Sequence, residues 1–302
     1  MMLQPRSPSP LADLHAVAPS ALQQAAEQCG LDARRTRLIR LFATAVYHLP
    51  AAEAVARIAP VTSTDTVTQL ATSVNVTQWL ARTGFPTVEP LPVDQPVTSH
   101  GCAITFWQYL PQNGPTPGVA ALGHLLRWLH RLGSPPASLP TYRPLGSVRH
   151  AIESSRAIDE GERAWLRQRC DQLLDAYDRL SFPLQAGMIH GDAWLGNLPR
   201  DGRRVVLADW DAVSIGPREI DLIPTVQAPR FGLPEHQRHA FIAAYGHDIR
   251  SWDGYPVLRD IRELSTTSAL LRDGHADEGA RRELQVRLES LRADDNHRWT
   301  PF

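Results

Sequence analysis

The segment MIHGDAWLGNLPRDGRRVVLADWDAVSIGPREIDLI, residues 188–223, constrains the fold of this chain more than any other part of the sequence. Two loops rich in Asp and Asn each follow a short apolar run within it. Acidic groups that follow strands indicate a site, and these loops contain Asp192, Asn197 and Asp209. The segment therefore predicts short strands whose ends carry carboxylate and amide oxygens.

The spacing of these three residues favours phosphoryl transfer. That reaction needs a carboxylate to orient the attacking hydroxyl, oxygen ligands for magnesium and positive charge on the phosphates. Asp192 and Asn197, five residues apart, have the spacing of the protein-kinase catalytic loop, whose Asp accepts the hydroxyl proton and whose Asn holds a metal ion. Asp209 then supplies a metal carboxylate. Alone, such an Asp–Asn pair is more often a turn that satisfies its own backbone, so the inference depends on the whole constellation.

The positive charges restrict the chemistry further, because all 31 are arginine and the sequence contains no lysine. Schiff-base catalysis and pyridoxal phosphate attachment are excluded, since arginine does not lose its proton in a protein. A cation that holds phosphate must therefore be an arginine. The formal net charge of -1 does not indicate a nucleic-acid-binding or polybasic membrane surface. We expect a small-molecule partner, no nucleic acid and no membrane.

Several kinds of segment are missing from the sequence. It contains no run of eighteen apolar residues, and its start lacks the basic end and apolar stretch of a signal peptide. We therefore expect a cytoplasmic protein. The three cysteines are far apart and form no CxxC pair, which argues against a disulfide framework and a zinc site. The twelve histidines include no HExxH motif, which argues against a zinc hydrolase.

A helix, a small antiparallel sheet and a second helix are predicted in the first 110 residues. A short helix begins near Pro19 and is stopped by Gly30. A helix that ends at Gly84 lies between β-rich pieces, of which the first alternates apolar and polar residues. The predicted strands cover 35–42, 45–49, 54–59 and 102–110, and the second helix covers 66–83.

A Pro- and Gly-rich stretch, PQNGPTPG at 111–118, marks a hinge before a mostly helical remainder. Asp201-Gly202 signals a hairpin. Apolar residues at helical spacing predict helices within 119–132, 165–177, 235–246, 256–272 and 278–292. The expected fold class is α+β, with an N-terminal helical arm (1–34), a sheet-based N-lobe that binds nucleotide (35–110) and a helical C-lobe that carries the catalytic loop, the metal site and the acceptor-binding helices (111–302).

The motifs resemble those of the aminoglycoside phosphotransferase and choline kinase superfamily. HGDAWLGN is followed by a DW pair twelve residues after Asn197, and a DL pair follows twelve residues later. Upstream, FATAVYHLP, AVARIAP, WLARTGFP, ITFWQYLP and LLRWLHRL occur in the family's order. The resemblance spans roughly residues 35 to 275. It implies a two-lobed protein-kinase-like fold with a small antiparallel sheet and one helix in the first lobe.

The resemblance also implies roles for the residues of the central segment. Asp192 would be the catalytic base or orienting carboxylate, and Asn197 and Asp209 would be magnesium ligands. His190 would be structural. Asp211 could contact a second metal or be a structural acid, and both readings stay open. Asp221 would tie the loop region together by hydrogen bonds.

In the first lobe the resemblance implies a nucleotide site for ATP or GTP. Arg57 takes the position of the phosphate-binding lysine, and a guanidinium can hold two phosphate oxygens at once. The hairpin before it has no glycine, so Thr44 and neighbouring amides would donate to the phosphates. Trp107 would border the base, and backbone groups of Gln108 and Tyr109 would pair with it.

One departure from the family concerns the helix that normally presents a glutamate to this cation. The alignment places Ser73 there, which leaves the cation without that ion-pair partner. Ser73 and the missing glycines motivate an alternative function, a nucleotide-binding pseudokinase that senses or scaffolds. Degenerate members usually lose the catalytic or the metal Asp, whereas Asp192 and Asp209 are both present here.

The leading function is a magnesium-dependent small-molecule kinase whose partners are a nucleoside triphosphate and a hydroxylated acceptor, with antibiotic inactivation implied by the family. Polycationic aminoglycosides favour an acidic cleft, whereas this chain has 31 arginines against 32 acidic residues. A neutral or weakly charged acceptor is therefore supported at least as well. A third reading, metal-dependent hydrolysis of a phosphate ester, leaves Arg57 and the hinge-like ITFWQYLP unexplained.

Overall fold

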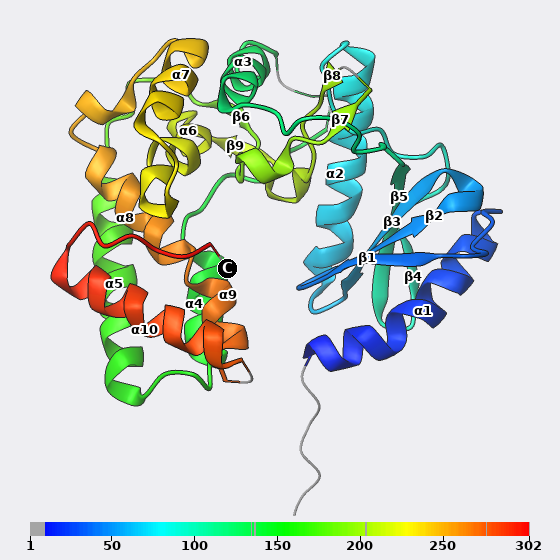
Figure 1. The fold of residues 1–302 in the computed structure, drawn as a ribbon, viewed down its shortest axis with the longest axis horizontal. Coiled ribbons are helices and arrows are strands. Elements are labelled where there is room, and N and C mark those ends of the chain that lie inside the picture. The colour runs from blue at the N-terminus through cyan, green and yellow to red at the C-terminus, as the bar shows by residue number, and fades with distance from the viewer. Residues whose placement is uncertain (1–9, 134, 136, 203, 276, 302) are drawn as a thin grey trace, which may run out of the picture. The chain divides into compact units, whose positions relative to one another are not determined.

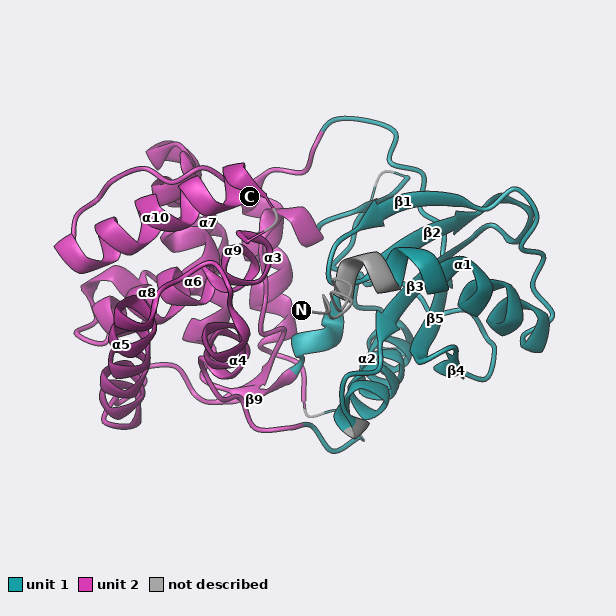
Figure 2. Ribbon diagram, turned by 90° about the horizontal axis from the view of Figure 1, so that it is seen from below, with its two compact units in different colours: residues 1–115, 135–139, 198–213 teal, residues 116–134, 140–197, 214–302 magenta. Residues whose placement is uncertain are grey.

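The computed structural model describes residues 10–133, 135, 137–202, 204–275 and 277–301. The chain divides into two compact units that are each discontinuous in sequence (Figure 2). Unit 1 comprises residues 1–115, 135–139 and 198–213, and unit 2 comprises residues 116–134, 140–197 and 214–302. The boundaries expected at residues 34 and 110 stay predictions.

Unit 1 is built on a five-stranded antiparallel sheet with the strand order β1-β2-β3-β5-β4 (Figure 1). The strands are β1 (Arg37–Leu41), β2 (Ala45–Leu49), β3 (Ala54–Pro60), β4 (Val97–Ser99) and β5 (Cys102–Gln108). Every second residue of β2 is buried, as period-two alternation requires. The predicted antiparallel sheet is confirmed, and the pairing of β3 with β5 sets Arg57 opposite Thr105.

Unit 1 also contains two helices: α1 (Pro10–Gln28) precedes the sheet in sequence, and α2 (Thr64–Arg82) lies between β3 and β4. The predicted start of the first helix near Pro19 is wrong, because the helix begins at Pro10 and contains Pro19. Proline removes one helical hydrogen bond, but a continuous face of buried side chains runs along the helix and packs into the sheet core. That face consists of Leu14, Ala18, Ala21, Leu22, Ala25 and Ala26.

The last part of unit 1 contains the segment from residue 198 to residue 213. It forms the predicted hairpin, with β7 (Arg200–Asp201) paired to β8 (Arg204–Val205), and ends in the short helix η3 (Trp210–Ala212). Backbone bonds join it to the loop after α2, since Leu207 N donates to Pro86 O and Val88 N donates to Leu207 O. These bonds make Asp209 part of the same unit as the sheet.

Unit 2 is mainly helical, with one two-stranded sheet formed by β6 (Gly187–Ile189) and β9 (Ser214–Gly216). Its α-helices are α3 (Val119–Leu129), α4 (Gly146–Ser154), α5 (Glu160–Asp178), α6 (Glu219–Val226), α7 (Glu235–Tyr245), α8 (Tyr255–Ser265), α9 (Ser268–Asp273) and α10 (Glu278–Ala293). Where α3 passes α7, Gly123 allows close approach, because a Cβ there would lie 2.7 Å from Phe241 O. No helix among the described residues is long and apolar enough to cross a membrane.

The single helix predicted over 256–272 is wrong, because the structure has two helices there, α8 and α9. The hydroxyls of Thr266 and Thr267 donate to backbone carbonyls three residues earlier, and such bonds compete with the helical ladder. Arg287 also donates to the carbonyl of Thr266. The helices α4 and α6 were not predicted from the sequence.

Candidate active site

The loop that contains Asp192 follows β6 in unit 2, and a buried carboxylate accepts hydrogen bonds from its backbone. Asp221, in the first turn of α6, is fully buried. Its two oxygens accept hydrogen bonds from His190 N and Gly191 N, each 2.8 Å long. Gly191 has φ +84°, a left-handed conformation that glycine adopts without a Cβ penalty. The predicted role of Asp221 in tying the loop together is confirmed.

Asp221 also links this loop to α3 and α7. His130 Nε2 lies 3.0 Å from Asp221 Oδ2, and His130 Nδ1 lies 2.8 Å from the Tyr245 hydroxyl. Burial tends to raise the pKa of Asp221, but the hydrogen bond and charge of His130, with help from His190, hold it below its usual value. Hydrogen bonds to a carboxylate favour its charged form, so Asp221 is a fixed anion under the loop.

Asp192 itself is 43% exposed, while its backbone is fixed. Asp192 N donates to His190 Nδ1 at 3.3 Å, which agrees with the structural role expected for His190. Asn197 ends the short helix η2 (Leu195–Asn197) and donates from Nδ2 to Asp192 O at 2.9 Å. Because the amide nitrogen is used in this bond, Oδ1 of Asn197 remains as an acceptor.

A residue that the sequence did not indicate contacts Asp192. Arg262 on α8 places Nη1 2.9 Å from Asp192 Oδ1. The two residues lie seventy positions apart, and no motif around Arg262 distinguishes it from the other arginines. Only the fold brings this guanidinium to the loop.

Unit 1 contains a second cluster of charges, centred on Arg57. Its Nη1 lies 2.8 Å from Asp209 Oδ1 and its Nη2 lies 2.7 Å from Asp211 Oδ2. The expectation that this cation lacks an ion-pair partner is therefore wrong, because the acidic segment after β8 provides two. Asp209 has φ +67°, a strained conformation for a residue with a side chain, and such strain concentrates at functional sites.

The helix α2 contributes neutral groups to this cluster instead of a glutamate. Gln69 Nε2 donates to the Asp211 carbonyl at 2.6 Å, and the buried Ser73 hydroxyl lies near the Asp211 carboxylate. Burial raises the pKa of Asp211, and the charge of Asp209 adds to this, while Arg57 and Ser73 oppose it. Within the described chain, Arg57 Nε, Ser73 Oγ and Asp211 Oδ1 are buried without a well-formed hydrogen bond.

The remaining residues expected at the nucleotide lie on the sheet or its turns. Thr44 is half-buried in the turn between β1 and β2, where its carbonyl accepts from Phe42 N. Trp107 donates from Nε1 to the Thr105 hydroxyl. Gln108 N and Tyr109 N donate to the carbonyls of Glu89 and Glu53. These two amides therefore have protein partners, so a base contact there would use other groups.

Magnesium prefers one or two protein carboxylates together with phosphate oxygens and water, and each unit by itself offers an oxygen ligand of a suitable kind. Asp209 offers a carboxylate that is 33% exposed, and Asn197 retains an amide oxygen. No group of three or more His, Cys, Asp or Glu side chains suited to a metal occurs among the described residues. A site that relies on phosphate oxygens does not need one.

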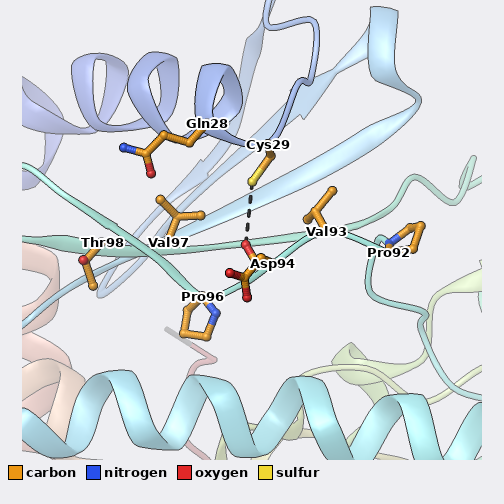
Figure 3. A pocket seen from close by; sticks show the side chains of 8 residues that line it. All are labelled: Gln28, Cys29, Pro92, Val93, Asp94, Pro96, Val97 and Thr98. Carbon is orange, nitrogen blue, oxygen red and sulfur yellow. Dashed lines mark hydrogen bonds between the residues drawn. The ribbon is translucent and has the colours of Figure 1, made fainter.

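A pocket in unit 1 is lined by other residues than these (Figure 3). Gln28 at the end of α1 and Cys29 just after it line the pocket, together with six residues from Pro92 to Thr98 that belong to β4 and the segment before it. Cys29 Sγ approaches Asp94 O at 3.8 Å. None of the predicted site residues lines this pocket.

Solved structures of several kinases share this fold. The amicoumacin kinase hAmiN, in complex with AMP-PNP, Ca2+ and Ami, has a TM-score of 0.69 at 14% identity and covers 93% of this chain and 94% of its own. Choline kinase LicA from Streptococcus pneumoniae has a TM-score of 0.65 at 11% identity, with coverages of 92% and 100%. The aminoglycoside phosphotransferase APH(3'')-Id from Streptomyces rimosus has a TM-score of 0.55 at 17% identity, with coverages of 83% and 98%.

The sequence itself places the chain in a family. No curated protein matches it significantly. The family model described as the phosphotransferase enzyme family matches residues 42–261, which include both the sheet of unit 1 and the loop that carries Asp192. The chain thus belongs to the phosphotransferase enzyme family and is a small-molecule kinase with a protein-kinase-like fold.

Proposed function

We propose that this kinase transfers the γ-phosphoryl group of ATP or GTP to a hydroxyl of an antibiotic-like or metabolite acceptor, and that its biological role is antibiotic inactivation by O-phosphorylation. The observation that carries the proposal is that hydrogen bonds hold the backbone of the loop that contains Asp192. A half-exposed carboxylate stands on a loop whose backbone is bonded to the buried Asp221 and to Asn197. Such rigid support holds a reacting group in its productive orientation.

In this proposal Asp192 binds the acceptor hydroxyl and accepts its proton. The hydroxyl oxygen forms a bond to the γ-phosphorus, the bond from that phosphorus to the leaving nucleoside diphosphate oxygen breaks, and the proton ends on the Asp192 carboxylate. Arg57 holds phosphate oxygens with its planar fork of donors. Thr44 donates to the phosphates, while Trp107, Gln108 and Tyr109 border the base.

Asp209 and Asn197 are the residues proposed to bind magnesium. When bound, magnesium neutralises charge on the phosphate oxygens. Asp209 must then redistribute its contacts, because its Oδ1 is paired with Arg57. The arrangement leaves Asp211 as the acid that keeps Arg57 in place.

The similar structures differ in the acceptors that their names print. The names of the similar structures include an antibiotic kinase, an aminoglycoside phosphotransferase and a choline kinase. An antibiotic acceptor is supported by two of these three names and by the family resemblance. The near balance of 31 arginines and 32 acidic residues supports a neutral or weakly charged acceptor.

The test is a screen of ATP and GTP consumption with magnesium against a panel of hydroxylated antibiotics and amino-alcohol metabolites. Mass spectrometry should find an acceptor that gains one phosphoryl group, and Asp192→Asn should slow this gain by on the order of a hundredfold or more. Nucleotide binding without transfer to any acceptor would favour the pseudokinase instead. Release of inorganic phosphate from a phosphate ester, without nucleotide, would favour the hydrolase.

A further inference from the structure

A guanidinium lies beside the proposed catalytic carboxylate, and the proposed function leaves it without a role. Arg262 on α8 and Asp192 both belong to unit 2, and their Nη1 and Oδ1 atoms are 2.9 Å apart. The Arg262 side chain is 28% exposed, so solvent and ligands can reach it. Between Asp192 and Asn197 the loop reads Ala-Trp-Leu-Gly and contributes no cation of its own.

The acids near Arg262 on its own helix are committed to other arginines. Asp260 pairs with Arg169 and with Arg259, each at 2.7 Å. Glu263 lies 3.6 Å from Arg230. Among the described residues, Asp192 is the one acid within ion-pair distance of Arg262, and the buried Arg262 Nε has no hydrogen-bond partner.

This arrangement matters once an acceptor binds. Asp192 would turn one oxygen to the acceptor hydroxyl, which leaves the positive charge of Arg262 only partly neutralised. The group attached next to that hydroxyl then comes within a few ångströms of the guanidinium. An ammonium in that place is repelled, whereas a carboxylate or carbonyl oxygen accepts a charge-assisted hydrogen bond.

We propose that Arg262 determines acceptor specificity: it selects a hydroxyl that stands beside a carboxylate or carbonyl oxygen and disfavours one beside an ammonium group. This inference rests on the proposed function, because it assumes that Asp192 receives the acceptor hydroxyl. It goes beyond that function by naming the chemical group of the acceptor that stands beside the phosphorylated hydroxyl.

A different role for the same residue is stabilisation of the phosphoryl group during transfer. The two roles differ in their kinetics. A contact to the transferring phosphoryl group acts on every acceptor alike and lowers kcat when it is removed. A contact to the acceptor changes the ratio of kcat/KM between acceptors, because it exists with one class and not with the other.

The experiment compares two sets of acceptors that differ only in the group next to the hydroxyl, a carboxylate or carbonyl in one set and a protonated amine in the other. Steady-state kcat/KM is measured for the parent, Arg262→Gln, Arg262→Lys and Arg259→Gln. Arg259 is a matched control, since it lies one turn earlier on α8, is 29% exposed and pairs with Asp260 and Asp294 instead of Asp192.

The parent should prefer the carboxylate or carbonyl set by on the order of tenfold to a hundredfold. Arg262→Gln should lose most of that preference, Arg262→Lys should keep it because the charge remains, and Arg259→Gln should match the parent. A parent preference for the ammonium set would overturn the inference, as would an equal loss of kcat for both sets in Arg262→Gln. Transfer to no acceptor at all would refute the proposed function itself, and the inference with it.

Discussion

Arg57 and Asp211 form an ion pair in which Nη2 lies 2.7 Å from Oδ2. Asp211 in turn stands near Ser73 of α2, at the helix position where the family resemblance leads one to expect a glutamate. The counter-ion of the proposed phosphate-binding cation therefore comes from the acidic segment after β8. The helix still contacts the cluster, through Gln69 and the Asp211 carbonyl.

The variant Asp211→Asn tests whether Asp211 serves as the counter-ion of Arg57 in place of the expected helix glutamate. Arg57 would keep Asp209 but lose its second charged partner, and a hydrogen bond to a charged group contributes roughly 1.5–3 kcal/mol. We expect kcat/KM for nucleotide to fall about tenfold or more. Steady-state kinetics at saturating acceptor measure the effect.

A second variant distinguishes a counter-ion role of Asp211 from a general loss of folding. Asp211→Asn combined with Ser73→Glu returns a carboxylate to the cluster from the helix side. Recovery of kcat/KM in the double variant would support a counter-ion role for Asp211. If Asp211→Asn alone has parental kinetics, the pair with Arg57 does not serve nucleotide binding.

For Arg57, we expect the alanine variant to lose tenfold to a hundredfold in kcat/KM for nucleotide, which corresponds to roughly 1.5–3 kcal/mol for a charge-assisted contact. Arg57→Lys should recover only part of this loss, because an ammonium lacks the planar fork that contacts two acids at once. The exposed Arg37 of β1 offers a control for the loss of an arginine from the same sheet. Parental efficiency in Arg57→Ala would place the phosphate contact elsewhere.

Asp221 should be a determinant of stability as well as of activity. Asp221→Asn removes a charge that accepts bonds from His190 N, Gly191 N and His130. We expect the free energy of unfolding to fall by roughly 1.5–3 kcal/mol or more at pH 7. Urea unfolding of the parent and the variant measures the difference.

The difference in unfolding free energy between the parent and Asp221→Asn should depend on pH, and the lowered pKa of Asp221 fixes the direction. The pKa of Asp221 is lowered in the folded protein, so its stabilisation is complete above the unfolded value of about 3.9 and is lost as the pH falls through the lowered value. The difference between parent and variant should be constant near neutral pH and shrink below about pH 4. A difference that grows in acid would contradict this assignment.

The sequence predicted the fold well where the periodicity was strong. The strands of unit 1 and the hairpin at Asp201-Gly202 follow from alternation and turn chemistry. The break between α8 and α9 did not, because it depends on a long-range bond from Arg287 to the Thr266 carbonyl. The first half of α1 was missed because proline is normally read as a helix boundary, whereas the helix begins at Pro10 and contains Pro19.

The candidate site was predictable where the residues are close in sequence. The spacing of Asp192 and Asn197, and the DL pair that Asp221 forms with Leu222, indicated a loop held by hydrogen bonds. The contact between Arg262 and Asp192 was not predictable, since a chain with 31 arginines offers no reason to choose that one. Which acid pairs with Arg57 likewise depends on packing against α2 that local pattern does not encode.

Asp192→Ala should lower kcat by on the order of a hundredfold or more and leave nucleotide affinity nearly unchanged, because positioned proton transfer and orientation contribute about that much. The Asp192 side chain is 43% exposed, so the variant should fold. Pre-steady-state transfer and a separate nucleotide titration measure the two quantities. Unchanged turnover would remove Asp192 from its proposed role.

The last prediction concerns Asp209, whose carboxylate is proposed to bind magnesium while it also pairs with Arg57 at 2.8 Å. Asp209→Ala removes the metal ligand, so magnesium should no longer strengthen nucleotide binding, whereas in the parent it should do so strongly. Metal-free nucleotide binding should persist, because Arg57 retains Asp211 and is relieved of one competing anion. Nucleotide titrations with and without magnesium measure both effects, and Asp201→Ala, an exposed acid of the neighbouring hairpin, serves as the control. Equal magnesium dependence in Asp209→Ala and the parent would show that the metal is held by other groups.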